Sequence, residues 1–236
     1  MISFIVPAYN EELELPRSLA AIRAAAEEAK EKYEIIVVDD GSTDATADIA
    51  RQSGARLVQI QRRQIAAARN AGAQITRGEI LFFVDADTRI SPSHVVGAIA
   101  ALNAGCSGGS ARVITDGMIP LWARVSVRLF CTVYFANNLG AGAFLFATRK
   151  NFDAIGGFDE ELFIGEEIYF SLALKKLGRF KILRAPIVTS GRKLRMYSAR
   201  HILSRSFSIM IRGTRAARSR DKLELWYDGK REGQSR

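Results

Sequence analysis

Three short apolar runs, each followed at once by polar residues, constrain the fold of this chain more than any other feature. The runs span residues 2–6, 35–38 and 80–84; Tyr9 and Glu11 follow the first, and pairs of aspartates follow the other two. Short β-branched runs bounded by turn residues are typical of buried parallel strands. Because ligands bind beyond the carboxyl ends of such strands, these polar side chains are expected to share one rim of a binding site.

Helical patterns fill the intervals between these runs. Apolar residues recur at three- and four-residue steps from Leu15 to Tyr33, and residues 65–75 are rich in alanine. Ser91 followed by Pro92 predicts the start of a further helix. The alternation of strand and helix predicts an α/β fold with right-handed crossovers, in which helices flank a mostly parallel central sheet.

Beyond residue 104 the pattern is less regular. It predicts strands at residues 105–113, 144–147 and 180–183, and helices at residues 119–135 and 168–177.

Positive charge is concentrated near the carboxyl end. The formal net charge is +9, and residues 192–220 contain nine Lys or Arg and no acid. Such a block indicates an anionic partner, namely a membrane surface, a nucleic acid or a phosphorylated substrate. An apolar stripe from Met196 through Leu203 to Met210 predicts a helix that either lies in a membrane interface or packs on the protein. No aromatic stacking platform supports binding of nucleic acid.

The sequence favours a cytoplasmic protein, with peripheral contact at the cytoplasmic face of the membrane as an addition. No basic leader precedes the first apolar run. Residues 129–148 carry no charge and are long enough to span a bilayer, but their centre, residues 137–142, is polar and glycine-rich and predicts a loop. Cys106 and Cys131 lack metal or redox spacing and are expected to be buried free thiols.

Asp85 and Asp87, at the end of the third run, are the sharpest chemical signal. Two carboxylates at a strand end suit a hard divalent cation that also binds substrate phosphates. The alternative is a turn in which Asp87 caps the next helix. Because packed carboxylates repel one another, we favour a divalent cation bound by Asp87 and Asp85. His201 is a candidate third ligand, whereas His94 is expected on the surface.

Three further signals have both a chemical and a structural interpretation. Asp39, after the second run, either accepts a hydrogen bond from a base or ribose or forms a tight turn. Arg69 either meets a diphosphate or a rim acid, or is solvated. Glu166 and Glu167 either supply a general base or are simply favoured by the dipole of the helix that they open.

The order of these motifs resembles glycosyltransferase family 2. The resemblance covers most of residues 1–185 and rests on VPAYNEE, VVDDGSTD, ARNAG, GEILFFVDAD and GGFDE, the last followed by GEE. The Gln-x-x-Arg-Trp motif of processive synthases is absent, which favours transfer of a single sugar.

This resemblance implies a GT-A fold and inverting transfer from a UDP- or GDP-linked sugar to an acceptor hydroxyl or lipid phosphate, with Mg²⁺ or Mn²⁺. The family's Glu-Asp motif, whose second acid is the usual base, is replaced here by two glutamates, so the base is Glu167 or, alternatively, Glu166. By the same resemblance, the nucleoside site consists of Pro7, Tyr9, Glu11 and Asp39, and Asp39 faces the base. Asp85 would contact the ribose, and Asp87 would bind the metal. Arg69 would contact the substrate.

We therefore expect a GT-A domain over residues 1–190, with a nucleotide-binding half at 1–104 and an acceptor-side half at 105–190. A basic amphipathic helical segment at 191–220 and a tail at 221–236 would follow.

Two other functions remain as alternatives. A sugar-phosphate nucleotidyltransferase needs a glycine-rich N-terminal loop with Arg and Lys, and VPAYNEE offers neither. A non-catalytic nucleotide-sugar binding module is disfavoured by the acid pairs at 85/87 and 166/167, although the altered base motif is compatible with it.

Overall fold

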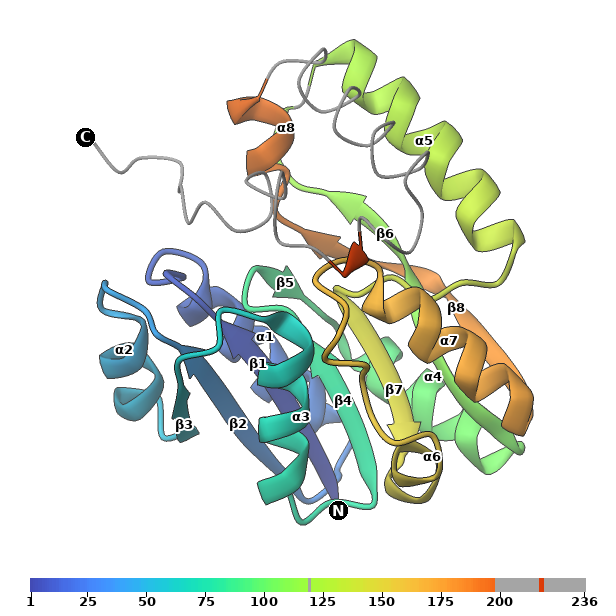
Figure 1. Ribbon diagram of the computed structural model, residues 1–236, viewed down its shortest axis with the longest axis horizontal. Coiled ribbons are helices and arrows are strands. Elements are labelled where there is room, and N and C mark those ends of the chain that lie inside the picture. Colours follow the sequence, from blue (N-terminus) through green and yellow to red (C-terminus); the bar gives the residue numbers. More distant parts are fainter. Residues whose placement is uncertain (119, 198–216, 219–236) are drawn as a thin grey trace.

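The first half of the chain forms the parallel part of one curved sheet (Figure 1). The computed structural model describes residues 1–118, 120–197 and 217–218. Strand β1 pairs in parallel with both β2 and β4, and β2 pairs in parallel with β3. The predicted parallel α/β arrangement is thus confirmed. The elements are β1 (Ile2–Ala8), α1 (Leu15–Glu28), β2 (Tyr33–Asp40), α2 (Thr46–Gln52), β3 (Arg56–Ile60), α3 (Ile65–Ile75) and β4 (Ile80–Val84).

The first helix is shorter than its apolar periodicity predicts. Helix α1 ends at Glu28, and Lys30 has a left-handed backbone with φ of 55°, which ends the helical path. Tyr33 instead begins β2, and its ring packs edge-on against Phe4 at 6.4 Å between centroids. Tyr33 fitted the helical pattern of apolar residues because β2 places it in the same core that α1 covers.

The second half adds an antiparallel strand at the centre of the sheet. Strand β7 lies between β4 and β6 and is antiparallel to both, whereas β8 is parallel to β6. The order across the sheet is β3-β2-β1-β4-β7-β6-β8-β5. These elements are β5 (Thr88–Arg89), α4 (Pro92–Asn103), β6 (Cys106–Thr115), α5 (Leu121–Ala136), β7 (Phe144–Thr148), α6 (Arg149–Ala154), α7 (Glu166–Leu177), β8 (Arg179–Thr189) and α8 (Arg192–Met196).

Two differences from the predicted second half matter for the site. Strand β8 continues past Leu183 to Thr189, and the unpredicted strand β5 pairs antiparallel with its end. Helix α7 begins at Glu166, where the acid pair was expected to open it and two residues before the periodic range 168–177. The β5–β8 pairing connects the residues after β4 with the chain that enters α8.

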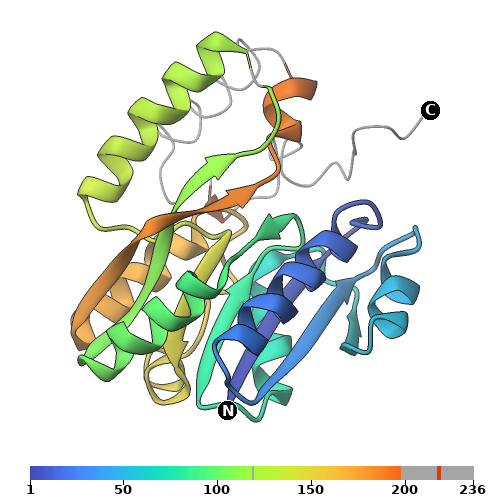
Figure 2. The ribbon, with the colours of Figure 1, turned by 180° about the vertical axis from the view of Figure 1, so that it is seen from behind.

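Aromatic side chains fill the core on both faces of the sheet. Helices α1 and α4 cover one face (Figure 2), where Phe4 stacks on Phe82 at 5.0 Å between ring centroids. Helices α3, α6 and α7 cover the other face, where Phe158 stacks on Phe170 at 4.2 Å. Burying one such ring contributes about 1.5–3 kcal/mol, so this core can hold the rim residues in fixed positions.

His94 is buried, contrary to the expected surface position. Its side chain is 3% exposed, and its Nδ1 accepts the backbone N–H of Ser91 at 2.9 Å. Its Nε2 lies 3.2 Å from the carbonyl oxygen of Ala185 on β8. Burial lowers the pKa of this imidazole. His94 therefore replaces the usual Glu of a capping box at the start of α4.

Several other predictions concern the ends and connections of the chain. Cys106 and Cys131 are free thiols, but they are half-buried rather than fully buried. Residues 137–143 form the predicted loop between α5 and β7. Within the described ranges, no helix combines the length and apolar character needed to cross a membrane. Of the predicted basic helical segment, the described part includes α8; residues 198–216, with His201, and the tail at 221–236 lie outside the described residues.

Candidate functional site

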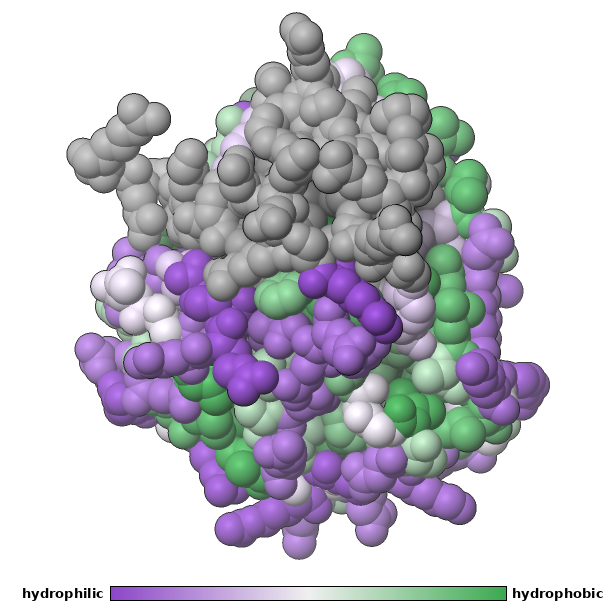
Figure 3. All heavy atoms as spheres, viewed as in Figure 1, coloured by the Kyte–Doolittle hydropathy of each residue, from purple (hydrophilic) through white to green (hydrophobic). Residues whose placement is uncertain are grey.

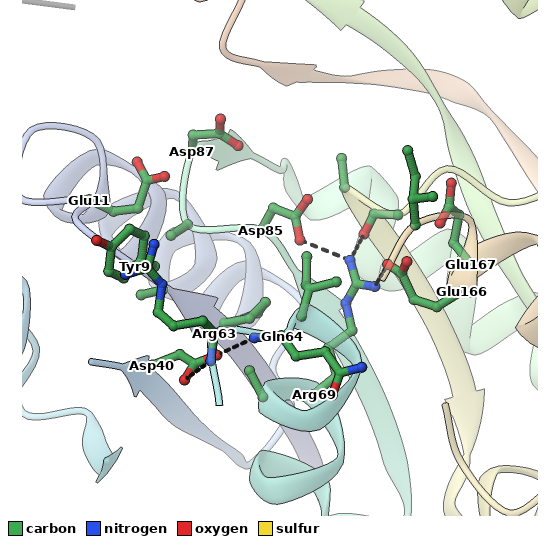
Figure 4. Close-up of a pocket in the computed structure, with 18 of the residues that line it drawn as sticks. Tyr9, Glu11, Asp40, Arg63, Gln64, Arg69, Asp85, Asp87, Glu166 and Glu167 are labelled. Atoms are coloured by element: carbon green, nitrogen blue, oxygen red, sulfur yellow. Dashed lines mark hydrogen bonds and ion pairs between the residues drawn. The ribbon is translucent and has the colours of Figure 1, made fainter. Parts of the chain in front are cut away.

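A pocket of about 410 Å³ opens at the carboxyl ends of β1 and β4 and at the start of α7 (Figure 4). Of the predicted site residues within the described ranges, all except Asp39 line it. They are Pro7, Tyr9, Glu11, Arg69, Asp85, Asp87, Glu166 and Glu167. The lining also includes Asp40, which was expected on the rim without a specific role. Further lining residues were not proposed from the sequence, namely Arg63, Gln64, Thr189, Arg192 and Lys193.

Arg69 is a fully buried cation at the centre of this site. Its side chain is 1% exposed, and its Nη1 donates to Glu166 Oε1 at 2.7 Å. Its Nη2 donates to Asp85 Oδ1 at 3.1 Å and to the carbonyl oxygen of Gly142 at 2.9 Å. Burial alone would lower the pKa of this guanidinium, but the charges of Asp85 and Glu166 raise it overall. We call Arg69, Asp85 and Glu166 the Arg69 cluster.

Close packing of α3 on the sheet brings Arg69 to this position. Gly72, one turn further along α3, lies so close to β1 and β2 that a Cβ there would collide with the side chains of Ile5 and Val38. Asn70 ties the same helix to the loop before α7, because it donates to the Phe158 carbonyl at 2.8 Å and accepts the Phe158 N–H at 2.9 Å. The ARNAG motif therefore both packs α3 against its neighbours, through Asn70 and Gly72, and supplies the charge of Arg69.

The acids around Arg69 differ in their ionisation. Burial, with the nearby charge of Asp87, raises the pKa of Asp85 to about 6 although Arg69 opposes the shift. Burial, with the adjacent charge of Glu166, raises the pKa of Glu167 to about 8. Glu167 lies in the pocket without an ion pair to any described residue, whereas Glu166 points toward Arg69 (Figure 4). Glu167 thus retains its proton at higher pH than an ordinary carboxylic acid.

A second arginine neutralises the opposite side of the rim. Arg192 donates from Nη1 to Glu11 Oε2 at 2.6 Å and from Nη2 to Glu11 Oε1 at 2.5 Å. The same Nη2 lies 3.3 Å from Asp87 Oδ2. Asp87 Oδ1 accepts the hydroxyl of Thr189 at 3.2 Å. We call Arg192, Glu11 and Asp87 the Arg192 cluster; the pairing of β5 with β8 brings its members together.

Asp116, at the end of β6, fixes the turn that carries Arg192. Its Oδ1 accepts the backbone N–H of Gly191 at 2.9 Å, and its Oδ2 accepts from Arg89 at 2.8 Å. Arg195 donates to the carbonyl oxygen of Asp116 at 3.0 Å. Burial would raise the pKa of Asp116, but these bonds from Arg89 and Gly191 lower it overall. The carboxylate therefore stays ionised and holds the turn.

Asp40 anchors a loop over the aromatic ring of Tyr9. Its carboxylate accepts the backbone N–H groups of Arg62, Arg63 and Gln64 at 2.7, 2.7 and 2.6 Å. Arg63 takes a left-handed backbone with φ of 50°, and its guanidinium lies 3.3 Å from the centroid of the Tyr9 ring. Strained backbone held by its surroundings is common at binding sites.

Asp39 is not among the residues that line the pocket. Its Oδ1 accepts the backbone N–H of Ser42 at 3.1 Å, and its Oδ2 accepts from Gln59 at 3.3 Å. These contacts explain the acid as part of a turn, and its predicted contact with a base stays a prediction. The signal for Asp40 was present in the sequence as the second acid after β2, but its three amide partners come from a loop that sequence spacing does not locate.

The donor groups suited to a metal are the carboxylates of Asp85 and Asp87. Among the described residues, no group of three or more His, Cys, Asp or Glu side chains is arranged to hold a metal ion. Two hard oxygen donors at one rim still match a cation that takes its remaining ligands from water and substrate phosphate. Arg192 lies against one of those oxygens.

Comparison with known proteins identifies the family of this chain. The sequence model of "Glycosyl transferase family 2" matches residues 3–156. An undecaprenyl-phosphate 4-deoxy-4-formamido-L-arabinose transferase from Aeromonas hydrophila is 31% identical over 102 residues, which is 40% of this chain and 31% of that protein. A validoxylamine A glucosyltransferase from Streptomyces hygroscopicus subsp. limoneus is 34% identical over 107 residues, 43% of this chain and 23% of the relative. The match thus spans about a third of these relatives or less.

Solved structures share the fold. TarS 1–349 from S. aureus, in complex with UDP-GlcNAc, superposes with a TM-score of 0.64 and 19% identity over 95% of this chain and 69% of that one. The mannosyltransferase PcManGT from Pyrobaculum calidifontis, in complex with GDP-Man and Mn²⁺, superposes with a TM-score of 0.66 and 23% identity over 90% of this chain and 64% of that one. These matches support the predicted GT-A fold.

Proposed function

The chain belongs to glycosyl transferase family 2, and from this membership and its pocket we propose that it transfers a single sugar from a UDP- or GDP-linked donor to an acceptor hydroxyl or lipid phosphate, with inversion. The observation that carries the proposal is the convergence of two acid pairs, from different elements of the fold, on one pocket. Asp85 and Asp87 lie at the end of β4, and Glu166 and Glu167 lie at the start of α7. A donor between them would have its diphosphate on one side and its acceptor on the other.

The nucleoside would occupy the part of the pocket around Tyr9. The planar guanidinium of Arg63 lies 3.3 Å from the centroid of the Tyr9 ring, and a flat base would stack on this ring in its place. Pro7 and Glu11 line the same part. The complexes of TarS with UDP-GlcNAc and of PcManGT with GDP-Man are consistent with either base.

Asp87, with Asp85 beside it, would hold Mg²⁺ or Mn²⁺. A cation bound there would neutralise charge on the departing diphosphate. The donor set fits, because both carboxylates reach the pocket and such cations commonly use one or two carboxylates plus substrate phosphate. Arg192 must leave Asp87 Oδ2, or share it, when a cation binds. PcManGT with GDP-Man and Mn²⁺ supports this choice of ions.

Glu167 is our choice for the general base. Glu166 is bound to Arg69 and therefore positions that arginine. Glu167 has no such partner among the described residues, and its pKa of about 8 makes it a strong proton acceptor once ionised. The acceptor oxygen would attack the anomeric carbon from the face opposite the departing diphosphate, and this attack inverts the anomeric centre. The proton of the acceptor would pass to Glu167.

The two acceptor classes make different demands on Glu167. A hydroxyl acceptor must lose a proton during attack, whereas a lipid phosphate is already an anion and needs no base. The A. hydrophila relative, named as an undecaprenyl-phosphate transferase, supports the phosphate class. The effect of removing the base therefore identifies the class.

The test compares Glu167→Gln with Glu166→Gln. For a hydroxyl acceptor, Glu167→Gln should lower turnover by roughly 10²–10⁴ with little change in donor affinity. For a phosphate acceptor, the same change should leave turnover nearly intact. Binding of UDP and GDP, measured by thermal shift with and without Mn²⁺, provides the control. A protein that binds neither nucleotide would contradict the proposal, and one that binds but never cleaves a donor would be a binding module.

A further inference from the structure

One helix of this protein exposes a continuous apolar stripe. On α5 the side chains of Leu121, Val125, Leu129 and Val133 are 72%, 60%, 67% and 58% exposed. They recur at four-residue steps, so at 100° per residue they lie along one side of the helix. Met118, just before α5, is 94% exposed. Single exposed apolar residues are ordinary, but a contiguous stripe of this kind marks a contact surface. We call these five side chains the α5 stripe.

The stripe lies at the edge of the molecule. Helix α5 stands apart from the sheet at the upper right of Figure 1, and hydrophobic side chains follow that edge in Figure 3. A hollow of about 1200 Å³ lies between α5 and strands β6 and β8, and Arg124 and Arg128 of α5 contribute to its wall. The side of α5 that carries the stripe is thus turned away from the rest of the fold.

The charge around the stripe is of one sign. Residues 117–152 contain no Asp or Glu, whereas Arg124 and Arg128 are exposed and border the stripe on the helix surface. An apolar stripe flanked by arginines fits a surface that offers hydrocarbon beside negative charge.

The same positive charge disfavours two other occupants of the α5 stripe, namely a second copy of α5 and the basic segment at residues 192–220. In a two-fold pairing of α5 helices the same patch meets itself, so arginines would approach arginines with no acid on the helix to offset them. Residues 192–220 of this chain contain nine Lys or Arg and no acid, so that segment would meet the stripe with the same sign of charge.

The helix leads directly to the catalytic end of the pocket. Tyr134, in its last turn, donates its hydroxyl to the carbonyl oxygen of Gly140 at 2.9 Å. Gly142 and Ala143, a few residues on, line the pocket. The charge of Glu167 also reaches Tyr134, whose pKa is raised by burial first and by Glu167 second.

We propose that the α5 stripe docks this protein on an anionic lipid bilayer, with the stripe in the headgroup region and Arg124 and Arg128 at lipid phosphates. The carboxyl end of α5 then places the Glu167 side of the pocket near the lipid surface. The proposal goes beyond the proposed reaction, since docking requires neither donor nor turnover.

The experiment is co-sedimentation of the full chain with phosphatidylcholine vesicles that contain or lack phosphatidylglycerol. The test variant is Val125→Ser with Leu129→Ser. The matched control is Val96→Ser with Leu177→Ser, on α4 and α7, where the side chains are 53% and 48% exposed. The test variant should bind anionic vesicles roughly tenfold more weakly than wild type, because apolar burial sets much of interfacial affinity. The control should match wild type, and high salt should weaken both.

Three results would overturn the proposal. The first is unchanged binding by the test variant, which would assign vesicle binding to the basic segment at 192–220. The second is equal binding to vesicles without phosphatidylglycerol. The third is a wild-type dimer in sedimentation equilibrium that the test variant abolishes, with no vesicle binding by either.

A second measurement does not depend on the folding of a stripe variant. The chain has two tryptophans, Trp122 on α5 and Trp226. In the Trp226→Phe chain, brominated lipids in anionic vesicles should quench the fluorescence of Trp122. Sedimentation with the vesicles but without quenching would place the contact elsewhere and contradict the proposal.

Discussion

Arg69 and Arg192 both neutralise acids on the rim of one pocket, but they belong to different parts of the molecule. Arg69 comes from the parallel half, is 1% exposed, and donates to Glu166, Asp85 and a backbone carbonyl. Arg192 comes from the turn after the last strand and binds Glu11 and Asp87. Both clusters are largely buried, but the Arg69 cluster joins α3 to the residues after β4 and to α7, whereas the Arg192 cluster joins the chain after β8 to the residues after β1 and β4. We propose that Arg192 is exchangeable, because a cation bound by Asp87 would displace it from Oδ2.

The largest effect should follow loss of the core arginine. Arg69→Met leaves the buried Glu166 and the half-buried Asp85 without their partner, so the free energy of unfolding should fall by about 3–5 kcal/mol. Denaturant unfolding measures it. Arg62→Met is the control, because Arg62 forms an exposed pair with Glu160 at 3.5 Å that should contribute less than about 1 kcal/mol. An equal loss of unfolding free energy in both variants would mean that the buried Arg69 pairs contribute no more than an exposed ion pair.

Next in size is the loss of the proposed metal ligand in the Arg192 cluster. Asp87→Asn should lower turnover by roughly 10²–10³ and should weaken donor binding only when Mn²⁺ is present. Donor affinity with and without Mn²⁺ is the readout. If the variant keeps the metal dependence of wild type, Asp87 is not a ligand.

The third prediction concerns Glu167, which lies beside the Arg69 cluster without an ion pair to any described residue. Its pKa is about 8 in the folded protein, above the ordinary 4.5, so the folded state binds the extra proton. Stability should therefore fall as pH rises from about 4.5 to about 8. Glu167→Gln should remove this fall and stabilise the protein by roughly 1–3 kcal/mol above that range, with no gain below it. Denaturant unfolding across pH checks the result, and a gain independent of pH would contradict it.

The smallest expected effect concerns the exchangeable arginine. Arg192→Gln should let Mn²⁺ bind the donor-free protein about tenfold more tightly, because the cation no longer competes with a guanidinium for Asp87. Titration followed by the electron paramagnetic resonance of free Mn²⁺ measures this. Arg89→Gln, whose arginine binds Asp116 instead, serves as control. Weaker Mn²⁺ binding after Arg192→Gln would mean that Arg192 supports the cation site.

The sequence predicts the acids at the strand ends in these two clusters far better than it predicts the two arginines. Asp85 and Glu11 follow strands whose carboxyl ends must share an edge of a parallel sheet, so their proximity follows from topology. Whether Arg69 was buried or solvated stayed open, because burial depends on how closely α3 packs on β1 and β2.

Arg192 could not be placed from the sequence. Its contact with Glu11 depends on β8 reaching Thr189 and pairing with the two-residue strand β5, and such short pairings leave no periodic signal. For the same reason Arg192 was counted only as part of the basic block at residues 192–220. His94 was misplaced because a histidine in a capping position looks like any polar residue near a helix start.

Gly72 determines how closely α3 approaches the sheet, and therefore where the guanidinium of Arg69 lies. Any side chain at that position forces α3 away from β1 and β2, since a Cβ would overlap Ile5. Arg69 moves with the helix, and hydrogen bonds of 2.7 and 3.1 Å tolerate only a few tenths of an ångström. A hydrogen atom in place of a methyl group thus determines whether two acids, 81 positions apart in the sequence (Asp85 and Glu166), can share one cation.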